Sequence, residues 1–557
     1  MSFLDQIFNR LHASADQTVL TELREPPLPV TGREFLDKIS QARGFLSSCG
    51  LKRGDRCALL AANGIDWIAV NLAIMAEELI AVPLYSRQAP SELIAMMKDC
   101  SPALICCGDT APRDAIAQSW PEVPRQALFE EIFETKDSRT GVSAPHNLDD
   151  SDVVTIIYTS GTSGEAKGVM ITAGNVAHIL KCTSGQLDLL MDWPSGKTDS
   201  RSDRVYQWAP LNFAAAWITT LTSLLGGSSI FLNTDLTKLA SELRTVAPDY
   251  FVNVPALLER VRRAVDEQLW KTGGLVRTIY LKAKAAYMRE HEDHGTFSDS
   301  LWLAAANAGV FPTIRKKMIG SNLKALICGS APLSVETQLF FMMLGIPVLQ
   351  VYGLTETTAI CTLDDPRHVE PGRAGPAIPG IEMKLGDNDE ILVRGPNVFP
   401  GYWNRPEETA KVLTDGWFHT GDQGEVNASG NWKIVGRIKN LIILNSGHNI
   451  APEPIEDEIL ARLPNAQHAV LIGNGRSYLS LLVTGNVKPE QVQAALDSVN
   501  PALPHYKQVR SFRILPEPFT IENGLLTANG KLKRDSIAKR FAQEIESMYE
   551  AKRTSIA

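Results

Sequence analysis

The chain has 557 residues, of which 44% are hydrophobic, 21% charged and 7% aromatic. This length exceeds that of a usual domain several times over, so more than one domain is expected, and the composition excludes a disordered or fibrous chain. The formal net charge is -8 and the cations are spread along the chain, which argues against a dedicated nucleic-acid surface. No nucleic-acid partner is therefore expected.

The cysteines and the N-terminal segment bear on the cellular compartment. The 8 cysteines form no C-x-x-C pair, and no histidine stands at a spacing that would complete a zinc site, as in a reduced intracellular chain. The segment MSFLDQIFNRLH has charges among its apolar residues and lacks the apolar core of a cleaved signal peptide. A cytoplasmic protein is predicted, and attachment to the inner face of a membrane is left open.

In the first part of the chain, short β-branched runs alternate with helical patterns. The spacing predicts a strand at 56–63, a helix at 66–78 and a strand at 79–85. Parallel strands wrapped by helices are therefore expected to form a large α/β domain. The same alternation recurs at 103–109, 153–160, 250–265 and 324–334.

A long run without charge, from Val205 to Thr234, raises the question of a membrane span. Pro210 and the glycine pair at 226–227 interrupt this run. A buried helix followed by a strand at 228–233 is therefore predicted instead of a span.

The stretch from about Val261 to Lys317 mixes cations with apolar residues at helical spacing. Such a pattern suits either a helix that lies on a membrane surface or a solvated helical face. The solvated face is favoured.

After about residue 380 the pattern changes to short strand-like runs separated by glycine and aspartate turns, at 390–395 and 431–437. A β-rich subdomain is expected there. From about Leu441 the chain predicts a small α+β domain, with a boundary near 436–440. Its expected elements are a helix at 454–463, strands at 468–473 and 478–485, and a helix after Lys533.

The strongest chemical signal is the segment 158–168, which follows the apolar run 153–157. Its glycines let backbone N–H groups approach an anion, its hydroxyls add donors, and its lysine adds a positive charge. The spacing differs from that of a Walker phosphate loop, and composition alone would also suit a surface loop. The residues of this candidate phosphate cradle are Thr159, Ser160, Gly161, Thr162, Ser163, Gly164 and Lys167.

This segment resembles a motif of the adenylate-forming superfamily, which includes acyl-CoA synthetases, firefly luciferase-like enzymes and peptide-synthetase adenylation domains. Four further segments resemble the other motifs of that superfamily in the same order, and the closest group is the long-chain fatty acyl-CoA synthetases. These segments are Val351–Thr357, Trp417–Asp422, Gly436–Lys439 and Leu526–Arg534.

The resemblance implies roles for individual residues. Glu356 would bind Mg²⁺, Thr355 would offer its hydroxyl near the α-phosphate, and Tyr352 would lie against adenine. Lys531 would act in adenylation together with Glu356, Thr355 and Lys167. The other residues of the implied nucleotide site are Gly329, Ser330, Ala331, Gly353, Asp422 and Arg437. As bare residues, these segments would equally suit turns, helix caps and surface ion pairs.

The resemblance also implies a reaction in two steps. A carboxylate attacks the α-phosphorus of ATP and releases pyrophosphate, and the thiol of coenzyme A then takes the acyl group. An N-terminal domain at 1–438 would bind AMP and the acyl group, and a mobile C-terminal lid at 439–557 would rotate about a hinge at Lys439 between the steps. ATP, Mg²⁺ and coenzyme A are the expected cofactors and co-substrates.

The substrate is expected to be a fatty acid of medium to long chain, because residues 208–217 carry no acid that would bind an amino group. Phe213 stands where many acyl-CoA synthetases have a histidine, and Ala166 and Asn440 are further departures. The candidate acyl and coenzyme A path consists of Trp208, Phe213, Ala214, Trp217, Gly447 and His448.

Several alternatives remain open at this point. An acyl-AMP ligase would deliver the acyl group to an acyl carrier protein instead of coenzyme A, and a luciferase-like oxygenase would share the motifs. A non-catalytic acyl- or nucleotide-binding homologue is disfavoured because Lys167, Glu356 and Lys531 are all present. A homodimer and peripheral contact with a membrane are left open.

Overall fold

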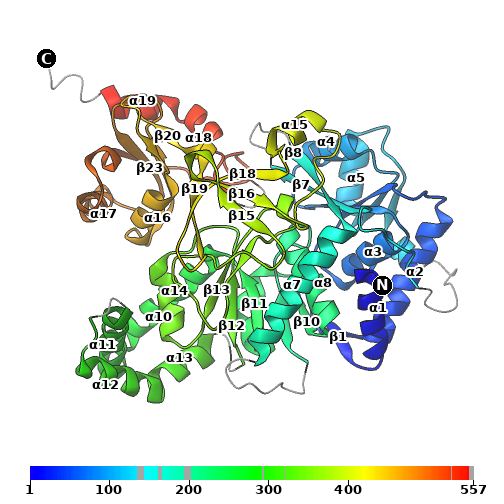
Figure 1. Cartoon of the computed structure of the whole chain (residues 1–557), viewed down its shortest axis with the longest axis horizontal. Helices are drawn as coiled ribbons and strands as arrows, with labels where there is room; N and C mark the ends of the chain where they lie inside the picture. Colours follow the sequence, from blue (N-terminus) through cyan, green and yellow to red (C-terminus); the bar gives the residue numbers. More distant parts are fainter. Residues whose placement is uncertain are drawn as a thin grey trace. The chain divides into compact units, whose positions relative to one another are not determined.

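A computed structural model describes residues 1–134, 144–160, 166–192, 202–291, 294–318, 320, 322–527 and 530–550 (Figure 1). The chain forms two compact units. The first comprises Met1–Met383, Val393–Phe418 and Asn427–Trp432. The second comprises Lys384–Leu392, His419–Val426 and Lys433–Ala557. The predicted α/β fold with parallel sheets is confirmed.

The first unit contains a six-stranded sheet in the order β6-β5-β3-β4-β7-β8. Its strands pair in parallel except for β7 and β8, which form an antiparallel hairpin. The strands predicted near 56–63, 79–85, 103–109 and 153–160 are thereby confirmed. The strands are β3 (Arg56–Leu60), β4 (Ile80–Leu84), β5 (Leu104–Cys107), β6 (Gln126–Leu128), β7 (Val153–Ser160) and β8 (Ala166–Thr172).

Helices of the N-terminal region surround this sheet (Figure 1, blue and cyan). Helix α3 (Ile65–Ala76) is buried at every position except Asp66, because it is apolar all round and has packing partners on every side. It contacts α2 most extensively. The other helices are α1 (Phe3–Ala13), α2 (Gly32–Ser48), α4 (Pro90–Cys100), α5 (Thr110–Ser119) and α6 (Phe129–Phe133).

The first unit also contains an eight-stranded sheet in the order β14-β13-β12-β11-β9-β10-β1-β2. The strands from β13 to β1 run parallel, and only the edge strands β14 and β2 are antiparallel to their neighbours. The strands are β1 (Thr18–Leu23), β2 (Leu28–Thr31), β9 (Arg204–Gln207), β10 (Ser229–Asn233), β11 (Tyr250–Asn253), β12 (Ala325–Cys328), β13 (Val348–Tyr352) and β14 (Thr362–Leu363).

The uncharged run from Val205 to Thr234 folds as predicted. It forms β9, the helix α8 (Ala214–Gly226) and β10. Helix α8 ends at Gly227, whose φ of 75° lies in the left-handed region that glycine adopts without strain. Across the described ranges of the chain, every helix is too short or too polar to cross a bilayer.

The predicted helical stretch near 261–317 is also confirmed. Its helices are α10 (Pro255–Thr272), α11 (Gly274–His291), α12 (Phe297–Ala305), a π-helical turn (Ala306–Val310) and α13 (Phe311–Met318). An ion pair between Arg289 and Asp299 joins α11 to α12. The outer side chains Leu275 and Phe297 are 74% and 83% exposed. The choice between a solvated face and a membrane surface stays a prediction.

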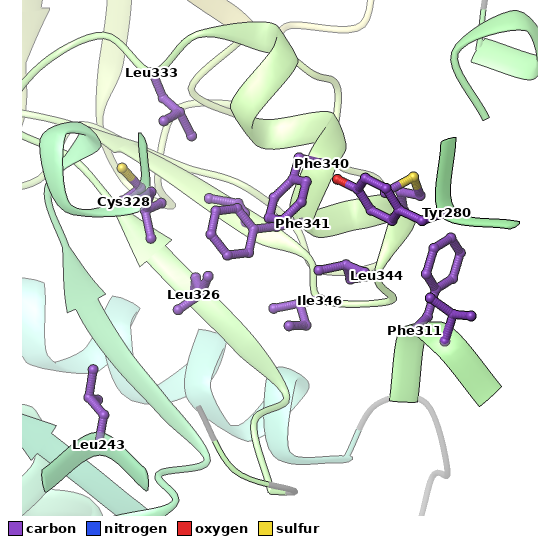
Figure 2. Packing of buried hydrophobic residues seen from close by; sticks show 14 of the residues in the cluster. Leu243, Tyr280, Phe311, Leu326, Cys328, Leu333, Phe340, Phe341, Leu344 and Ile346 are labelled. Carbon is purple, nitrogen blue, oxygen red and sulfur yellow. The ribbon is translucent and has the colours of Figure 1, made fainter. Parts of the chain in front are cut away.

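The helical stretch shares a core with the eight-stranded sheet, as Figure 2 shows. Phe340 and Phe341 come from α14 (Val335–Met343) and Leu326 comes from β12, while Tyr280 and Phe311 come from the helical stretch. All five side chains are at most 2% exposed. Hydrophobic burial therefore holds the helical stretch against the eight-stranded sheet.

Three more helices complete the connections of the first unit. Helix α7 precedes β9, α9 follows β10, and α15 lies between β16 and β17. Their bounds are α7 (Ala173–Asp192), α9 (Leu239–Val246) and α15 (Pro406–Val412).

A five-stranded sheet follows, in the order β15-β16-β18-β17 with β19 paired to β18, and β17 and β18 are antiparallel. The β-rich region predicted after residue 380 is thus confirmed. Its strands are β15 (Glu382–Leu385), β16 (Glu390–Arg394), β17 (Leu413–Thr414), β18 (Trp417–Val426) and β19 (Trp432–Arg437). The compact units divide within this region, so the second unit includes residues before Lys439. The functional boundary at Lys439 stays a prediction.

The rest of the second unit is an α+β arrangement around the sheet β22-β23-β24, preceded by the small β20-β21 hairpin. The predicted helix and two strands are present, but α17 and β24 were not predicted from the sequence. The elements are β20 (Ile442–Ile443), β21 (Asn449–Ile450), α16 (Glu453–Ala461), β22 (Ala466–Ile472), β23 (Leu479–Gly485), α17 (Pro489–Val499), β24 (Val509–Leu515), α18 (Arg534–Arg540) and α19 (Ala542–Glu550).

Asp364 is a fully buried carboxyl group next to β13. One oxygen accepts the backbone N–H of Gln350 at 2.7 Å, while the other has no hydrogen-bond partner among the described residues. Burial above all, with smaller contributions from Glu370 and Asp365, raises the pKa of Asp364 to about 8, although the hydrogen bond from Gln350 opposes this shift. The native state therefore holds a proton that the unfolded chain releases near pH 4.

This proton predicts the direction of a pH dependence. The contribution of Asp364 to stability is fully present below pH ~4 and is lost progressively as the pH rises to the native pKa. Asp364→Asn should therefore flatten the fall of Tm between pH 5 and 8, measured by scanning fluorimetry at each pH. Asp37→Asn is the control, because it removes an exposed carboxyl group on α2. Equal slopes for Asp364→Asn and wild type would contradict the assignment.

Candidate functional site

Several residues predicted for the nucleotide site and the acyl path lie at one edge of the eight-stranded sheet. Tyr352 is the last residue of β13, Gly329 directly follows β12, and Trp208 directly follows β9. These strands are parallel, so their carboxyl ends open onto the same edge, where α/β sheets bind ligands. Tyr352 is buried, whereas Ser330 and Ala331 are exposed just beyond the edge.

Close backbone packing explains two glycines at this edge. A Cβ at Gly353 would lie 2.1 Å from the carbonyl oxygen of Ala359, and one at Gly329 would lie 3.0 Å from that of Val351. Any side chain at Gly353 would force the backbone apart. Ser330, in contrast, adopts a φ of 73° without being glycine. Backbone strain of this kind is concentrated at functional sites.

The candidate phosphate cradle lies at the tip of the β7-β8 hairpin. Thr159 pairs with Lys167 in the antiparallel register, and Ser160 pairs with Ala166. Gly161, Thr162, Ser163 and Gly164 lie outside the described residues. The strand pairing therefore fixes the backbone at both ends of the cradle, including the backbone of Lys167.

Lys167 is half-buried between an acid and an aromatic ring. Its Nζ donates to Glu408 Oε2 at 2.6 Å and lies 5.2 Å from the centre of the Tyr402 ring. The hydrogen bond from Lys167, followed by one from Lys411, lowers the pKa of Glu408 to about 2. The pair is thus a fully charged contact between residues 241 positions apart.

Glu356 lies in the 3₁₀ turn Thr355–Thr357, directly beyond the carboxyl end of β13. Its Oε1 accepts a hydrogen bond from the Tyr402 hydroxyl at 2.9 Å, and the backbone N–H of Phe399 donates to its carbonyl at 2.9 Å. The carboxylate is partly exposed. One oxygen is thus oriented by the protein, which leaves the second oxygen available to a ligand.

This arrangement fits the Mg²⁺ ion that the family resemblance implies. The described residues contain no cluster of three or more His, Cys, Asp or Glu side chains that would form a complete protein cage for a metal. Mg²⁺ usually takes one or two carboxylates, keeps several waters and binds substrate phosphates. The Glu356 carboxylate, with one oxygen held by Tyr402 and a lysine predicted to bind phosphate nearby, fits that requirement.

Tyr402 and Glu408 were not predicted from the sequence. Both stand in the segment after β16, where the surrounding glycine, proline and charged residues indicate only a turn and a helix start. Their importance becomes visible only when the chain folds and β8 meets this segment. Local spacing therefore carries no signal that could have identified them.

In the second unit, the predicted ribose-binding residues form a close ion pair. Arg437 Nε lies 2.6 Å from Asp422 Oδ1, and the Asp422 side chain is only 5% exposed. Asp422 is on β18 and Arg437 ends β19, so strand pairing brings them together. When ionised, the carboxylate is only an acceptor of hydrogen bonds, which suits a pair of ribose hydroxyls.

Lys439, the predicted hinge residue, lies two positions beyond this pair in a short 3₁₀ turn. Burial lowers its pKa, and the positive charge of Arg437 lowers it further. Asn440 beside it donates to Glu453 Oε1 at 2.6 Å. Asn440 differs from the residue that is common in the family motif, and this hydrogen bond gives it a structural role.

Lys531, the predicted adenylation lysine, is exposed in a turn of the second unit. Its backbone carbonyl accepts from the Thr527 N–H at 2.8 Å, and its own N–H donates to Thr527 Oγ1 at 3.1 Å. Arg534 follows and forms two hydrogen bonds to the buried carboxylate of Glu456, at 2.7 and 2.5 Å. Hydrogen bonds to Thr527 thus hold the backbone of the exposed residue Lys531.

The candidate acyl-path residues differ in burial. Phe213 is partly exposed and packs against Tyr85, with ring centres 6.1 Å apart. Trp208 donates its indole N–H to the Val252 carbonyl at 2.9 Å. Trp217 is 2% exposed and donates to Asn71 on α3 at 2.9 Å, which makes it part of the core. Ala214 is also buried.

The loop residues Gly447 and His448 belong to the second unit. Gly447 has a φ of 83°, and no atom stands within 4 Å of where its Cβ would be. His448 is exposed and stacks on Tyr506, with ring centres 4.1 Å apart. A role for these residues beside coenzyme A stays a prediction.

Comparison with known proteins places these observations in a family. Residues 9–403 match the AMP-binding enzyme family, and residues 439–553 match the AMP-binding enzyme C-terminal domain. The chain is 28% identical to the long-chain-fatty-acid–CoA ligase FadD15 of Mycobacterium bovis, over 93% of this chain and 92% of that protein. It is 26% identical to the chloroplastic long-chain-fatty-acid–acyl-carrier-protein ligase AEE15 of Arabidopsis thaliana, over 94% and 83%.

Solved structures share the fold. The O-succinylbenzoate coenzyme A synthetase of Bacillus subtilis, in complex with ATP and magnesium ion, matches with a TM-score of 0.73 at 19% identity. The match covers 95% of this chain and 98% of that one. The arrangement of sheets described above is therefore that of this group of structures.

The Lys167–Glu408 pair yields a prediction about ATP affinity. Glu408→Gln should lower the Kd for ATP, because the phosphates would no longer compete with a carboxylate for Lys167. Solvent screens this partly exposed ion pair and makes it weak, so the Kd should fall by no more than about five-fold. Isothermal titration with ATP, in the absence of a fatty acid, measures it. Glu407→Gln removes the same charge next door and is the control. A Kd that is unchanged or raised in Glu408→Gln alone would refute the competition.

Proposed function

This chain belongs to the AMP-binding enzyme family, and we propose that it activates a medium- to long-chain fatty acid with ATP and passes the acyl group to coenzyme A. The predicted membership of the adenylate-forming superfamily and the predicted class of AMP-forming acid–thiol ligase are confirmed. One structural observation carries the proposal. Lys167 and Glu356, a phosphate-binding cation and a metal-binding carboxylate, flank the same Tyr402 side chain.

In the first step, an oxygen of the fatty-acid carboxylate forms a bond to the α-phosphorus of ATP, and the bond to pyrophosphate breaks. Two anions must approach each other, so the site must supply positive charge and alignment more than a proton carrier. Lys167 would neutralise phosphate charge and Thr355 would orient the α-phosphate. Bound Mg²⁺, held through Glu356, would add charge neutralisation of its own.

Residues of the second unit would complete the first step. Asp422 would accept hydrogen bonds from the ribose hydroxyls, with Arg437 orienting its carboxylate through the 2.6 Å ion pair. Lys531 would place its ammonium against the developing negative charge. The short backbone bonds between Lys531 and Thr527 support this role, because they fix where the flexible side chain begins.

In the second step, the thiol sulfur of coenzyme A forms a bond to the acyl carbon and the bond between that carbon and the AMP oxygen breaks. The thiol loses its proton, and AMP leaves. We propose that rotation of a C-terminal domain about Lys439 separates the two steps, with Gly447 and His448 then facing the thiol. Arg437 precedes this hinge by two residues, and Asp422 lies on β18, the strand that pairs with β19.

The acyl group is assigned from the apolar residues beyond β9. Trp208, Phe213 and Tyr85 offer aromatic surface without an acid, which suits a hydrocarbon chain rather than an amino acid. The relative FadD15 is named a long-chain-fatty-acid–CoA ligase, in line with this assignment. The relative AEE15 is named for an acyl-carrier-protein acceptor, so delivery to a carrier protein is the second candidate.

Three further properties remain proposals. The protein is placed in the cytoplasm, with or without contact with the inner face of a membrane. A homodimer is left open, and so is a luciferase-like oxygenase, which light emission would reveal. None of these changes the adenylation chemistry.

The proposal predicts a pattern of pyrophosphate release. Release from ATP and Mg²⁺ should peak with a fatty acid in a series from acetate to palmitate and should continue only when coenzyme A is added. Lys531→Ala should lower the rate at least a hundred-fold, because electrostatic stabilisation by one group contributes about 3 kcal/mol to the transition state. Lys533→Ala removes a nearby cation and is the control.

The outcomes separate the candidates. Sustained release only with an acyl carrier protein would favour the carrier-protein ligase. No release with any acid would contradict the acyl-activating function. Equal losses in Lys531→Ala and Lys533→Ala would contradict the specific role of Lys531.

A further inference from the structure

Tyr402 contacts both charged groups of the phosphate site in the first unit. Its ring centre lies 5.2 Å from Lys167 Nζ, and its hydroxyl donates to Glu356 Oε1 at 2.9 Å. The side chain itself is only 8% exposed. One buried residue thus presents an aromatic face to the cation and a hydrogen-bond donor to the carboxylate.

The position of Tyr402 is fixed by backbone pairing with the phosphate hairpin. Tyr402 forms a β-bridge with Val169 of β8. The Trp403 N–H donates to the Gly168 carbonyl at 2.7 Å, and the Met170 N–H donates to the Gly401 carbonyl at 3.2 Å. The segment that carries Tyr402 therefore pairs antiparallel alongside the strand that carries Lys167, and this pairing fixes the register between them.

The ring is also fixed by its neighbours. Phe399 packs edge-on against Tyr402 with ring centres 4.9 Å apart, and Phe418 packs against Phe399 at 5.5 Å. The Tyr402 N–H donates to Thr409 Oγ1 at 2.9 Å. Aromatic packing and this hydrogen bond leave the ring little freedom to turn away from either partner.

The arrangement also explains which acid Lys167 pairs with. A lysine and a glutamate that serve one nucleotide would attract each other in a half-buried site, and that ion pair would occupy both groups. Lys167 instead forms its ion pair with Glu408, while Glu356 is engaged by a neutral hydroxyl. The Tyr402 side chain contacts Lys167 and Glu356. The Lys167 ammonium lies over the face of the ring, and the Glu356 carboxylate is hydrogen-bonded to the hydroxyl.

We propose that Tyr402 is a positioning residue of the nucleotide site, whose hydroxyl orients the Glu356 carboxylate toward the metal and whose ring holds Lys167 apart from that carboxylate. This inference rests on the proposed function, since it concerns the binding of Mg²⁺ and ATP. The two roles reside in different parts of one side chain. They are therefore separable by substitution.

The test measures ATP binding by isothermal titration, with Mg²⁺ and with EDTA, in the absence of a fatty acid. In wild type, Mg²⁺ should tighten ATP binding. Tyr402→Phe keeps the ring and removes the hydroxyl, so the gain in affinity from Mg²⁺ should shrink about ten-fold while the Kd in EDTA stays the same. Tyr402→Leu removes the ring as well and should also raise the Kd in EDTA.

Tyr280→Phe is the matched control. The Tyr280 hydroxyl also donates to a carboxylate, Asp266, at 2.7 Å, and its side chain is 1% exposed in the helical stretch. Its loss should lower Tm in the same way as Tyr402→Phe, with no change in ATP binding under either condition. This control separates a general loss of packing from a specific loss of metal orientation.

Three results would overturn the inference. The first is that Mg²⁺ tightens ATP binding as much in Tyr402→Phe as in wild type. A second is a loss of equal size in EDTA and in Mg²⁺, which would assign Tyr402 a purely structural role. The third is wild type that binds no ATP in either condition, which would refute the proposed function itself and the role of Tyr402 with it.

Discussion

The parallel pairing of β9, β11, β12 and β13 is the constraint on which the rest of the site depends. Parallel strands must all end at the same edge, so the residues that follow them are forced together whatever their distance along the chain. Trp208, Gly329 and Tyr352 meet there for this reason. The close approach of Gly353 to the Ala359 carbonyl then fixes the loop that carries Glu356.

A second constraint is electrostatic. Activation of a carboxylate by ATP brings two anions together, and a protein can achieve this only with positive charge that is already in place. In the first unit the proposed source of this charge is Lys167, which forms an ion pair with Glu408 and lies over the ring of Tyr402. In the second unit the proposed sources are Arg437, beside Asp422, and Lys531, whose backbone is hydrogen-bonded to Thr527.

Much of the fold followed from local sequence pattern. The strands near Ala58, Val82 and Ile105 are short apolar runs between turns, and burial on both faces is what such runs require. The uncharged run around α8 was correctly assigned to the core, since glycine and proline interrupt it. Strand β24 was missed because Arg510, Ser511 and Arg513 break its apolar pattern. Its parallel pairing with β23 is a tertiary contact that no local window contains.

The residues of the candidate site also differ in whether local sequence could identify them. Lys167, Glu356, Asp422 and Lys531 were identified because they stand in motifs whose spacing is visible in the chain. Tyr402 and Glu408 were not, because their significance arises from contacts with residues far away in sequence, such as the 241-position separation of Glu408 from Lys167. Motifs thus indicated the groups that would meet the substrate, and the structure was needed for the groups that hold them.

The most direct test of the account follows the oxygen atoms of the substrate. A fatty acid labelled with oxygen-18 in its carboxylate would be incubated with ATP, Mg²⁺ and coenzyme A, and the nucleotide product would be analysed by mass spectrometry. If the carboxylate attacks the α-phosphorus and the thiol then displaces AMP, the AMP must carry one labelled oxygen. Label in pyrophosphate or inorganic phosphate, or AMP without label, would contradict the proposed adenylate.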